Sequence, residues 1–220
     1  MYVIASTTRT QVPSLDALEV VDLTPADVPE AVDVLARGMR DNPLHIAAFG
    51  ADPERRLRLI RSVFGAVFAS LDTQQPFGLR RDGILVAATG VAPPGTCRPS
   101  ARQAVRMAPT MARLGPRTIG RTARWMREWA RHDPNDAHSH LGPLAVDAGL
   151  QGQGIGSVLL AEYCRRVDSA GQVAYLETDK PANVHFYARA GFEVVHESEV
   201  LGVRNWYMRR EPRSAAGSPA

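Results

Sequence analysis

The sequence predicts an α/β protein, and three observations support this fold class. A short apolar strand ending at Val146 runs through a glycine-rich turn into an amphipathic helix. In the first ninety residues a strand, two helices and two further strands follow one another. Near the end, a strand at 173–178 leads through a short helix into two closing strands. Strands and helices therefore alternate along most of the chain.

Composition indicates an ordinary globular protein. The chain has 220 residues, of which 45% are apolar and 22% charged, and its net charge of +3 is too small to indicate nucleic-acid binding. Cys97 and Cys164 are too few and too far apart to suggest a disulfide framework or a zinc site. We find no signal-peptide pattern and no apolar run of membrane-spanning length, so we expect a cytoplasmic protein without a membrane partner.

The front half is predicted from local patterns. Residues 1–17 are expected to be a flexible lead-in, followed by a strand at 18–23. Thr24 as cap and Pro25 in the first position then predict a helix, which ends at a break over 41–45. A second helix is expected from about 52 to 71, with one apolar face. The Asp82-Gly83 pair predicts a hairpin between strands at 76–81 and 84–91.

An arginine-rich segment spans about residues 98–134. Pro109, Gly115 and Pro116 are expected to divide it into two or three helices. Its arginines invite a nucleic-acid interpretation, but their helical spacing favours a solvated helix face. These arginines are Arg98, Arg102, Arg106, Arg113, Arg117, Arg121, Arg124, Arg127 and Arg131.

The central stretch joins a strand at 139–146 to a helix at 154–168 through the loop Gln151 to Gly156. Pro143 cannot donate a ladder hydrogen bond, so this strand must be bulged or unpaired there. Glycines at 152, 154 and 156 let the backbone turn and expose N–H groups at a helix start, which suits a phosphate. The spacing excludes the Gly-Lys-Ser/Thr nucleotide loop and the Gly-x-Gly-x-x-Gly fingerprint; a plain strand–helix turn remains an alternative.

A second motif follows the strand at 173–178. Asn183 is expected to cap a short helix that ends at Gly191, before strands at 192–199 and 203–210 and a disordered tail at 211–220. The segment from Asn183 to Phe192 and the loop Gln151 to Gly156 together resemble the GNAT superfamily of acetyl-CoA-dependent N-acetyltransferases, whose Gln/Arg-x-x-Gly-x-Gly/Ala and Asn-x-x-Phe-Tyr-x-x-x-Gly-Phe motifs they match.

The resemblance implies one domain over 18–210, with a mixed sheet of six to seven strands, splayed parallel central strands, flanking helices and a helical insertion. It also implies acetyl-CoA as co-substrate and no metal. Backbone groups of the strand before the loop would bind the pantetheine arm, and one N–H there would polarise the thioester. The implied coenzyme residues are Leu144, Ala145, Val146, Gln151, Gly152, Gln153, Gly154, Ile155, Gly156, Ser157, Asn183, Phe186 and Tyr187.

The resemblance also implies catalytic roles. Tyr187 would donate a proton to the departing coenzyme A sulfur. The base that deprotonates the amine is open among several residues; Glu177, at a strand's carboxyl end, ranks first and His140 second. The other candidates are His138, His45 and Asp41. Direct transfer in a ternary complex is expected, because neither cysteine stands at a motif position.

The sequence does not identify the acceptor. We expect a primary amine on a small molecule, bound near Asp41, Asn42 and His45, with the insertion as a helical flap beside the pocket. Two alternatives stay open: an acyl-CoA-binding sensor without turnover, and a protein acetyltransferase whose insertion docks acidic partners. No nucleic-acid partner is expected, and exposed Trp125 and Trp129 would make a homodimer plausible.

Overall fold

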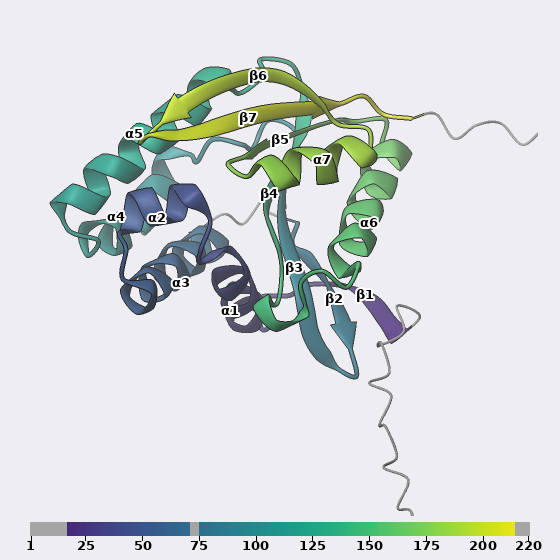
Figure 1. Ribbon diagram of the computed structural model, residues 1–220, viewed down its shortest axis with the longest axis horizontal. Coiled ribbons are helices and arrows are strands. Elements are labelled where there is room, and N and C mark those ends of the chain that lie inside the picture. Colours follow the sequence, from purple (N-terminus) through teal and green to yellow (C-terminus); the bar gives the residue numbers. More distant parts are fainter. Residues whose placement is uncertain (1–16, 71–74, 214–220) are drawn as a thin grey trace, which may run out of the picture.

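The computed structural model describes residues 17–70 and 75–213, in which seven strands form one mixed sheet in the order β1-β2-β3-β4-β5-β7-β6 (Figure 1). The predicted lead-in, except residue 17, and the predicted tail, except residues 211–213, lie outside the described residues. No helix in the described part is long and apolar enough to cross a membrane. The strands are β1 (Leu18–Asp22), β2 (Phe77–Arg81), β3 (Ile84–Ala92), β4 (His138–Val146), β5 (Val173–Thr178), β6 (Glu193–Val200) and β7 (Val203–Arg210).

The helices differ from the sequence prediction mainly at their starts. The helices are α1 (Val28–Met39), α2 (Pro43–Phe49), α3 (Pro53–Ser70), α4 (Ala101–Ala112), α5 (Pro116–His132), α6 (Ile155–Ser169) and α7 (Pro181–Arg189), with a 3-10 turn at Ala148–Leu150. The first helix begins at Val28 rather than Pro25, because the Asp27 carboxylate accepts the N–H and hydroxyl of Thr24 and holds the chain in a turn. The predicted break over 41–45 is wrong from Pro43 onward, where α2 begins with proline in its first turn.

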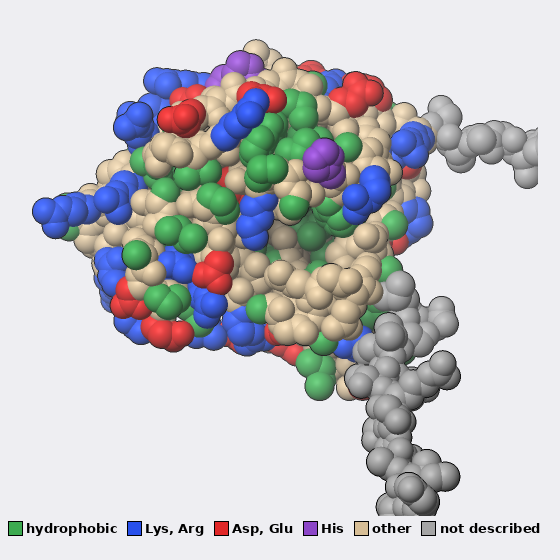
Figure 2. All heavy atoms as spheres, in the orientation of Figure 1, with side chains coloured by type: hydrophobic (Ala, Val, Ile, Leu, Met, Phe, Trp, Pro, Cys, Tyr) green, Lys and Arg blue, Asp and Glu red, His purple; other side chains and the backbone are tan. Residues whose placement is uncertain are grey.

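The insertion consists of two helices, α4 and α5. A reciprocal capping box between Ser100 and Gln103 begins α4. Pro109 lies inside this helix and does not divide it; the break falls at Gly115, whose φ of +81° no β-branched residue would adopt readily. All nine arginines of the insertion are exposed, and blue side chains extend over this end of the molecule in Figure 2. Only Arg98 and Arg131 among them form ion pairs with described residues.

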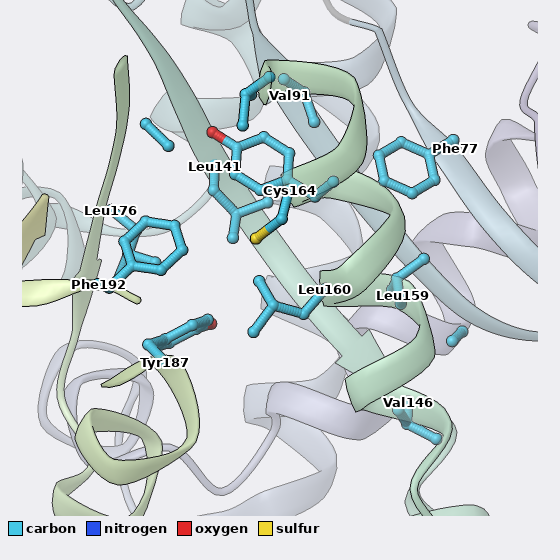
Figure 3. Close-up of a cluster of buried hydrophobic side chains, with 14 of the residues drawn as sticks. Phe77, Val91, Leu141, Val146, Leu159, Leu160, Cys164, Leu176, Tyr187 and Phe192 are labelled. Carbon is cyan, nitrogen blue, oxygen red and sulfur yellow. The ribbon is translucent and has the colours of Figure 1, made fainter. Parts of the chain in front are cut away.

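Helices cover both faces of the central strands. Ala145 on β4 packs in a cluster with Ala31, Val34 and Leu35 of α1. Its neighbour Val146 belongs to a second cluster that contains buried residues of α6. Because successive residues of a strand point to opposite faces, α1 and α6 lie on opposite sides of the sheet. Figure 3 shows part of the α6 cluster, where side chains from β4, β5, α6 and α7 converge.

The two central parallel strands pair over a short length only. β4 pairs with β5 at three positions, from His138 opposite Val173 to His140 opposite Tyr175. On the other side of β4 the antiparallel register to β3 shifts, so that Gly142 and Pro143 together oppose one residue of β3. This bulge, which Pro143 predicted, sits where the strands separate. The β5-facing edge of β4 beyond His140 is left without a strand partner.

Close packing of α1 on β4 gives a stability prediction. A Cβ at Gly38 would lie 2.5 Å from the Val146 carbonyl oxygen, whereas a Cβ at Gly65 in α3 would meet nothing within 4 Å. Gly38→Ala should therefore lower the free energy of unfolding by about 1–3 kcal/mol through overpacking. Gly65→Ala, the matched control, should raise it by up to about 1 kcal/mol because alanine favours the helix. Equal effects in denaturant titrations would contradict this packing.

Candidate active site

A groove of about 440 Å³ lies between the end of α1, the open edge of β4, the glycine loop and the start of α7. In Figure 2 the surface is hollowed between α7 and this loop, with hydrophobic atoms on the floor of the hollow. Ten of the thirteen predicted coenzyme residues line the groove: Leu144, Ala145, Val146, Gln151, Gly152, Gly154, Gly156, Ser157, Asn183 and Phe186. Sequence segments about forty residues apart thus meet in one site.

The glycine loop presents backbone donors to this groove. Gly152 and Gly154 have φ values of +80° and +84°, a left-handed conformation that glycine adopts without strain. The N–H groups of residues 152–156 have no acceptor among the described residues. The amide of Gln151 donates to the carbonyls of Val146 (3.2 Å) and Gly38 (3.1 Å), which fixes the loop against β4 and α1. The loop is therefore held with its free donors at the start of α6.

The other predicted coenzyme residues take different positions. The side chain of Ile155 is buried in the core, so only the backbone of this residue is available to the groove. Gln153 does not line the groove, and Tyr187 lines the neighbouring cavity instead. Asn183 is not the cap of α7, which is Lys180; its side-chain amide donates to the Thr178 hydroxyl at 3.1 Å.

Two cations of the groove were missed by sequence reasoning. Lys180 and Arg189 both line the groove, one at each end of α7. Neither forms an ion pair with a described residue, whereas Arg37 nearby pairs with Asp147 at 2.7 Å. Their placement follows from the direction of α7 and from no motif, so only the fold identifies them. Together with the free N–H groups they make the groove suitable for an anion.

A second cavity, of about 230 Å³, adjoins the groove. Both are lined by Met39, Asn42, Leu144 and Asn183, so a molecule in one can reach into the other. Side chains of α2, α3 and α5 form its apolar walls, and the carboxyl end of β5 supplies three of its polar residues. As expected of a flap, α5 borders this cavity. The polar residues of the lining are Asn42, His45, Thr122, His140, Glu177, Thr178, Asp179, Asn183 and Tyr187.

The cavity brings the two leading base candidates together. His140 Nε2 lies 2.9 Å from Glu177 Oε2, and the Glu177 side chain is only 3% exposed. Burial lowers the pKa of His140, but the charge of Glu177 and the neighbouring Asp133 outweigh it, and the net pKa lies well above the usual value. Glu177 and His140, which the sequence analysis ranked as separate candidates for the base, therefore form one hydrogen-bonded pair.

Tyr187 is buried and points from α7 into the core, beside Leu160 and Phe192 (Figure 3). Burial, with a smaller contribution from Asp179, raises the pKa of its phenol. The hydroxyl has no hydrogen-bond partner among the described residues. A phenol with a raised pKa stays protonated at neutral pH, which a proton donor requires.

Asp179 is a residue of the cavity lining that the sequence analysis did not single out. Burial raises the pKa of its carboxyl, and the Leu44 N–H, which it accepts at 2.7 Å, offsets part of this rise. The residue is 8% exposed and borders the cavity beside Glu177. Its position two residues after Glu177, at a strand's carboxyl end, was the available signal.

The predicted acceptor residues divide into two groups. Asn42 and His45 line the cavity. Asp41 does not: its carboxylate binds Arg40 and Arg56, and the hydrogen bond from Arg40 above all holds the pKa of Asp41 below its usual value. Asp41 is thus engaged in holding α2 and α3 together and is not placed to act as base.

Buried polar atoms in the cavity wall lack partners. His45 Nδ1, Thr122 Oγ1 and Trp125 Nε1 have no hydrogen-bond partner among the described residues. Trp125 is 6% exposed and lies edge-on to His45, with ring centroids 5.3 Å apart. Trp129 is half-buried and donates to Asn205 at 3.2 Å. The two tryptophans are therefore wall residues, and the premise of exposed tryptophans for a homodimer is wrong.

His138, the remaining base candidate, does not line the cavity. Its Nε2 lies 3.4 Å from Cys97 Sγ, and its Nδ1 lies 2.8 Å from the Asp136 carbonyl. Burial opposes ionisation of Cys97, but hydrogen bonds from His138 and His140 lower the pKa of this thiol to about 7. The hydrogen bond to Cys97 raises the pKa of His138. Cys97 and His138 therefore belong to a cluster that adjoins the cavity at His140.

Burial of His45 gives a pH-dependent stability prediction. Burial, assisted by Lys180 and Arg56, lowers the pKa of His45 to about 3. In the unfolded chain this side chain titrates near 6.5, so below that pH the unfolded state takes up a proton that the folded state excludes. Stability is therefore lost as the pH falls from about 6.5 towards 3. At pH 5 this loss is about 2 kcal/mol.

His45→Gln should remove this contribution. The difference in unfolding free energy between pH 8 and pH 5, measured by denaturant titration, should shrink by about 2 kcal/mol in this variant. His185→Gln is the control, because the His185 side chain on α7 is exposed. An unchanged difference in His45→Gln would show that His45 is charged in the folded protein.

Comparison with known proteins agrees with this geometry. Residues 119–194, from α5 to the start of β6, match the family model of the acetyltransferase (GNAT) domain. This segment contains the glycine loop, β5 and α7, which carry most of the groove. This match supports N-acetyltransferase activity.

Solved structures share the whole fold. A histone acetyltransferase HPA2 and related acetyltransferase from Corynebacterium glutamicum is 19% identical, with a TM-score of 0.66 over 91% of this chain and 99% of that chain. A polyamine N-acetyltransferase from Drosophila melanogaster is 14% identical, with a TM-score of 0.58 over 88% of this chain and 99% of that one. The PaiA N-acetyltransferase from Thermoplasma acidophilum, in complex with coenzyme A, is 14% identical, with a TM-score of 0.54 over 88% and 98%. The chain thus matches the GNAT acetyltransferase domain over residues 119–194 and shares the fold of these N-acetyltransferases.

Proposed function

We propose that the protein is an acetyl-CoA-dependent N-acetyltransferase that acts on a primary amine of a small molecule. One observation carries the proposal. A groove with free backbone donors opens into a cavity that contains Tyr187 and Glu177, so an anionic coenzyme and an amine would meet between an acid and a base.

The groove fits acetyl-CoA. Free N–H groups at the start of α6 suit a pyrophosphate, and Lys180 and Arg189 add positive charge for further phosphate. The β5-facing edge of β4 offers Leu144, Ala145 and Val146 to an extended amide-containing arm. When bound, acetyl-CoA supplies an acetyl group activated as a thioester. A similar structure, the PaiA protein, was solved in complex with coenzyme A.

The cavity fits an amine with an apolar body. Its lining includes the carboxyls of Glu177 and Asp179 and, within the described part of the chain, no lysine or arginine. Opposite these lie Phe49, Phe64 and Trp125, whose faces attract cations and apolar carbon alike. Similar structures include a polyamine N-acetyltransferase that forms N-acetylagmatine and an agmatine N-acetyltransferase, both acting on amines.

The residues of the two cavities support direct transfer. Glu177 accepts a proton from the acceptor ammonium, and its hydrogen bond to His140 holds it in place. The neutral amine attacks the thioester carbonyl, whose developing negative charge a backbone N–H of the free β4 edge stabilises. Tyr187 donates its proton to the departing thiolate, and the phenolate recovers a proton from the nitrogen of the newly formed amide. Neither Cys97 nor Cys164 lines this cavity, so no acyl-enzyme is needed.

The enclosed cavity favours a small acceptor over a protein. Helices α2, α3 and α5 line it, and its volume of about 230 Å³ suits a small molecule rather than a folded partner. A sensor without turnover would need the groove but no buried tyrosine and carboxylate beside it. The presence of both in one cavity therefore favours an enzyme.

Coenzyme binding is tested at Gly156. A Cβ there would be in ordinary contact, 3.5 Å from Val146, so a small side chain fits. Gly156→Asp should keep the fold, because a carboxylate is favourable at a helix start, yet repel the phosphates. We expect calorimetry to show acetyl-CoA binding weakened by about 100-fold or more, against about tenfold for the neutral, equally sized Gly156→Asn. Equal affinities for the two would indicate that phosphate does not lie at this loop.

Catalysis is tested at Tyr187. A thiol-release screen of wild-type protein against polyamines, agmatine and other small amines should show turnover with at least one of them. Tyr187→Phe should then lower kcat by about 10²–10⁴-fold, the contribution of a general acid, without changing acetyl-CoA affinity. Tyr207→Phe is the matched control, because Tyr207 lines neither cavity and its hydroxyl bonds Ser198. Full activity of Tyr187→Phe would exclude the acid role; acetyl-CoA binding without thiol release for any amine would favour the sensor.

A further inference from the structure

Four side chains of metal-ligand type gather behind the acceptor cavity. One ligand atom each from Cys97, Asp133, His138 and His140 lies within 4.8 Å of the others. They come from three segments of the chain: Cys97 precedes α4, Asp133 follows α5, and the two histidines stand on β4. The cluster is mostly enclosed, since Asp133 and His140 side chains are 13% and 19% exposed and His138 is 4% exposed.

The strand geometry aims both imidazoles at the same point. Residues 138 and 140 are two apart on β4, before its bulge, and therefore point to the same face. The Asp136 carbonyl lies 2.8 Å from His138 Nδ1, and Glu177 lies 2.9 Å from His140 Nε2. Each partner accepts the N–H of one ring nitrogen, so that loss of the other ring proton on metal binding would make His138 Nε2 and His140 Nδ1 the ligand atoms. Carboxylate or carbonyl partners of this kind orient the histidines of metal sites.

The remaining atoms converge on those two nitrogens. His138 Nε2 lies 3.4 Å from Cys97 Sγ and 3.3 Å from Asp133 Oδ1, and His140 Nδ1 lies 3.8 Å from the same oxygen. Tetrahedral zinc with bonds of about 2.0–2.3 Å places its ligand atoms roughly 3.3–3.8 Å apart. Asp133 Oδ1 and His140 Nδ1 are buried and have no hydrogen-bond partner among the described residues. Burial of such atoms costs free energy that a bound cation would offset.

We propose that Cys97, Asp133, His138 and His140 bind a Zn²⁺ ion in a tetrahedral site. Thiolate, imidazole and carboxylate ligands in a compact four-fold set suit zinc better than the oxygen-seeking Mg²⁺ or Ca²⁺. A surface cavity lined by Cys97, Asp133 and His138 gives the ion a path from solvent. The proposal departs from the sequence expectation of no metal, which considered the spacing of the two cysteines alone.

The site has a structural consequence for the insertion. Cys97 and Asp133 flank the helical pair α4 and α5 at its two ends, and the histidines belong to the central strand. Zinc would therefore fasten both ends of the insertion to β4. Because α5 forms a wall of the acceptor cavity through Trp125, the metal would also fix the shape of that cavity. All four protein ligands are present, which is typical of a structural rather than a catalytic zinc site.

Metal binding is tested on the full, untagged chain, stripped with a chelator and reloaded with Zn²⁺ or Co²⁺. We expect one equivalent of zinc by elemental mass spectrometry and a higher Tm for the loaded protein. The cobalt form should show the strong visible absorption of a tetrahedral site and a thiolate-to-cobalt charge-transfer band. These readouts do not involve acetyl transfer, so they stand apart from the proposed function.

Variants decide whether the metal occupies this cluster. Cys97→Ser should abolish the charge-transfer band, and His138→Gln should weaken zinc binding by more than about tenfold. Cys164→Ala and His185→Gln, which change the same residue types outside the cluster, should leave both properties unaltered. Protein that takes up no zinc after reloading would overturn the proposal, as would an unchanged cobalt spectrum in both cluster variants.

A measurement on the wild-type protein tests the site without relying on variants that fold. Zinc should slow alkylation of Cys97 by iodoacetamide at least about tenfold, because a metal-bound thiolate is a poor nucleophile, and should leave Cys164 unaffected. Peptide mass spectrometry reports the two cysteines separately. Equal alkylation of Cys97 with and without zinc would show that its sulfur is not a ligand.

Discussion

The separation of β4 from β5 is the constraint on which both cavities depend. The strands pair only from His138 to His140, and beyond that point Pro143 has no N–H to offer a ladder. The opposing strand contributes Gly90, whose carbonyl oxygen would lie 3.0 Å from a Cβ at Gly142, so the bulge favours a glycine at position 142. The result is a strand edge with free backbone groups inside the protein. Backbone of this kind is stable only where a ligand or water can bind it.

The groove and the adjoining cavity carry side chains of opposite charge. The groove has cations at its rim and backbone N–H groups at the glycine loop, and the adjoining cavity has Glu177 and Asp179 and no basic side chain other than histidine. In an apolar setting each set acts over a longer range than it would in water. Under the proposed function, the anionic coenzyme and the ammonium group of the acceptor would be drawn to different cavities. Their reacting atoms would then meet where Asn42 and Asn183 border both cavities.

Local patterns predicted the strands, the hairpin, the glycine loop and α6 within one or two residues, because periodicity and turn chemistry are local. They failed where a distant partner decides. Asp41 looked available until Arg56 of α3 proved to bind it. The helix α2 was missed because seven residues are too few for a periodic signal, although Asn42-Pro43 is a fair helix start. Nothing near Cys97 in the sequence indicates that it meets two histidines more than forty residues away.

His140 connects the chemistry of the cavity with the proposed zinc site, because its two nitrogens face different neighbours. Nε2 meets Glu177 at the cavity, and Nδ1 faces Asp133 and the cluster behind it. A metal on Nδ1 would keep the proton on Nε2, so Glu177 would accept a hydrogen bond from the ring and stay oriented towards the amine. The position of the base would then depend on the ends of the insertion, through Cys97 and Asp133. In this arrangement the segment that walls the acceptor cavity also holds in place the group that deprotonates the acceptor.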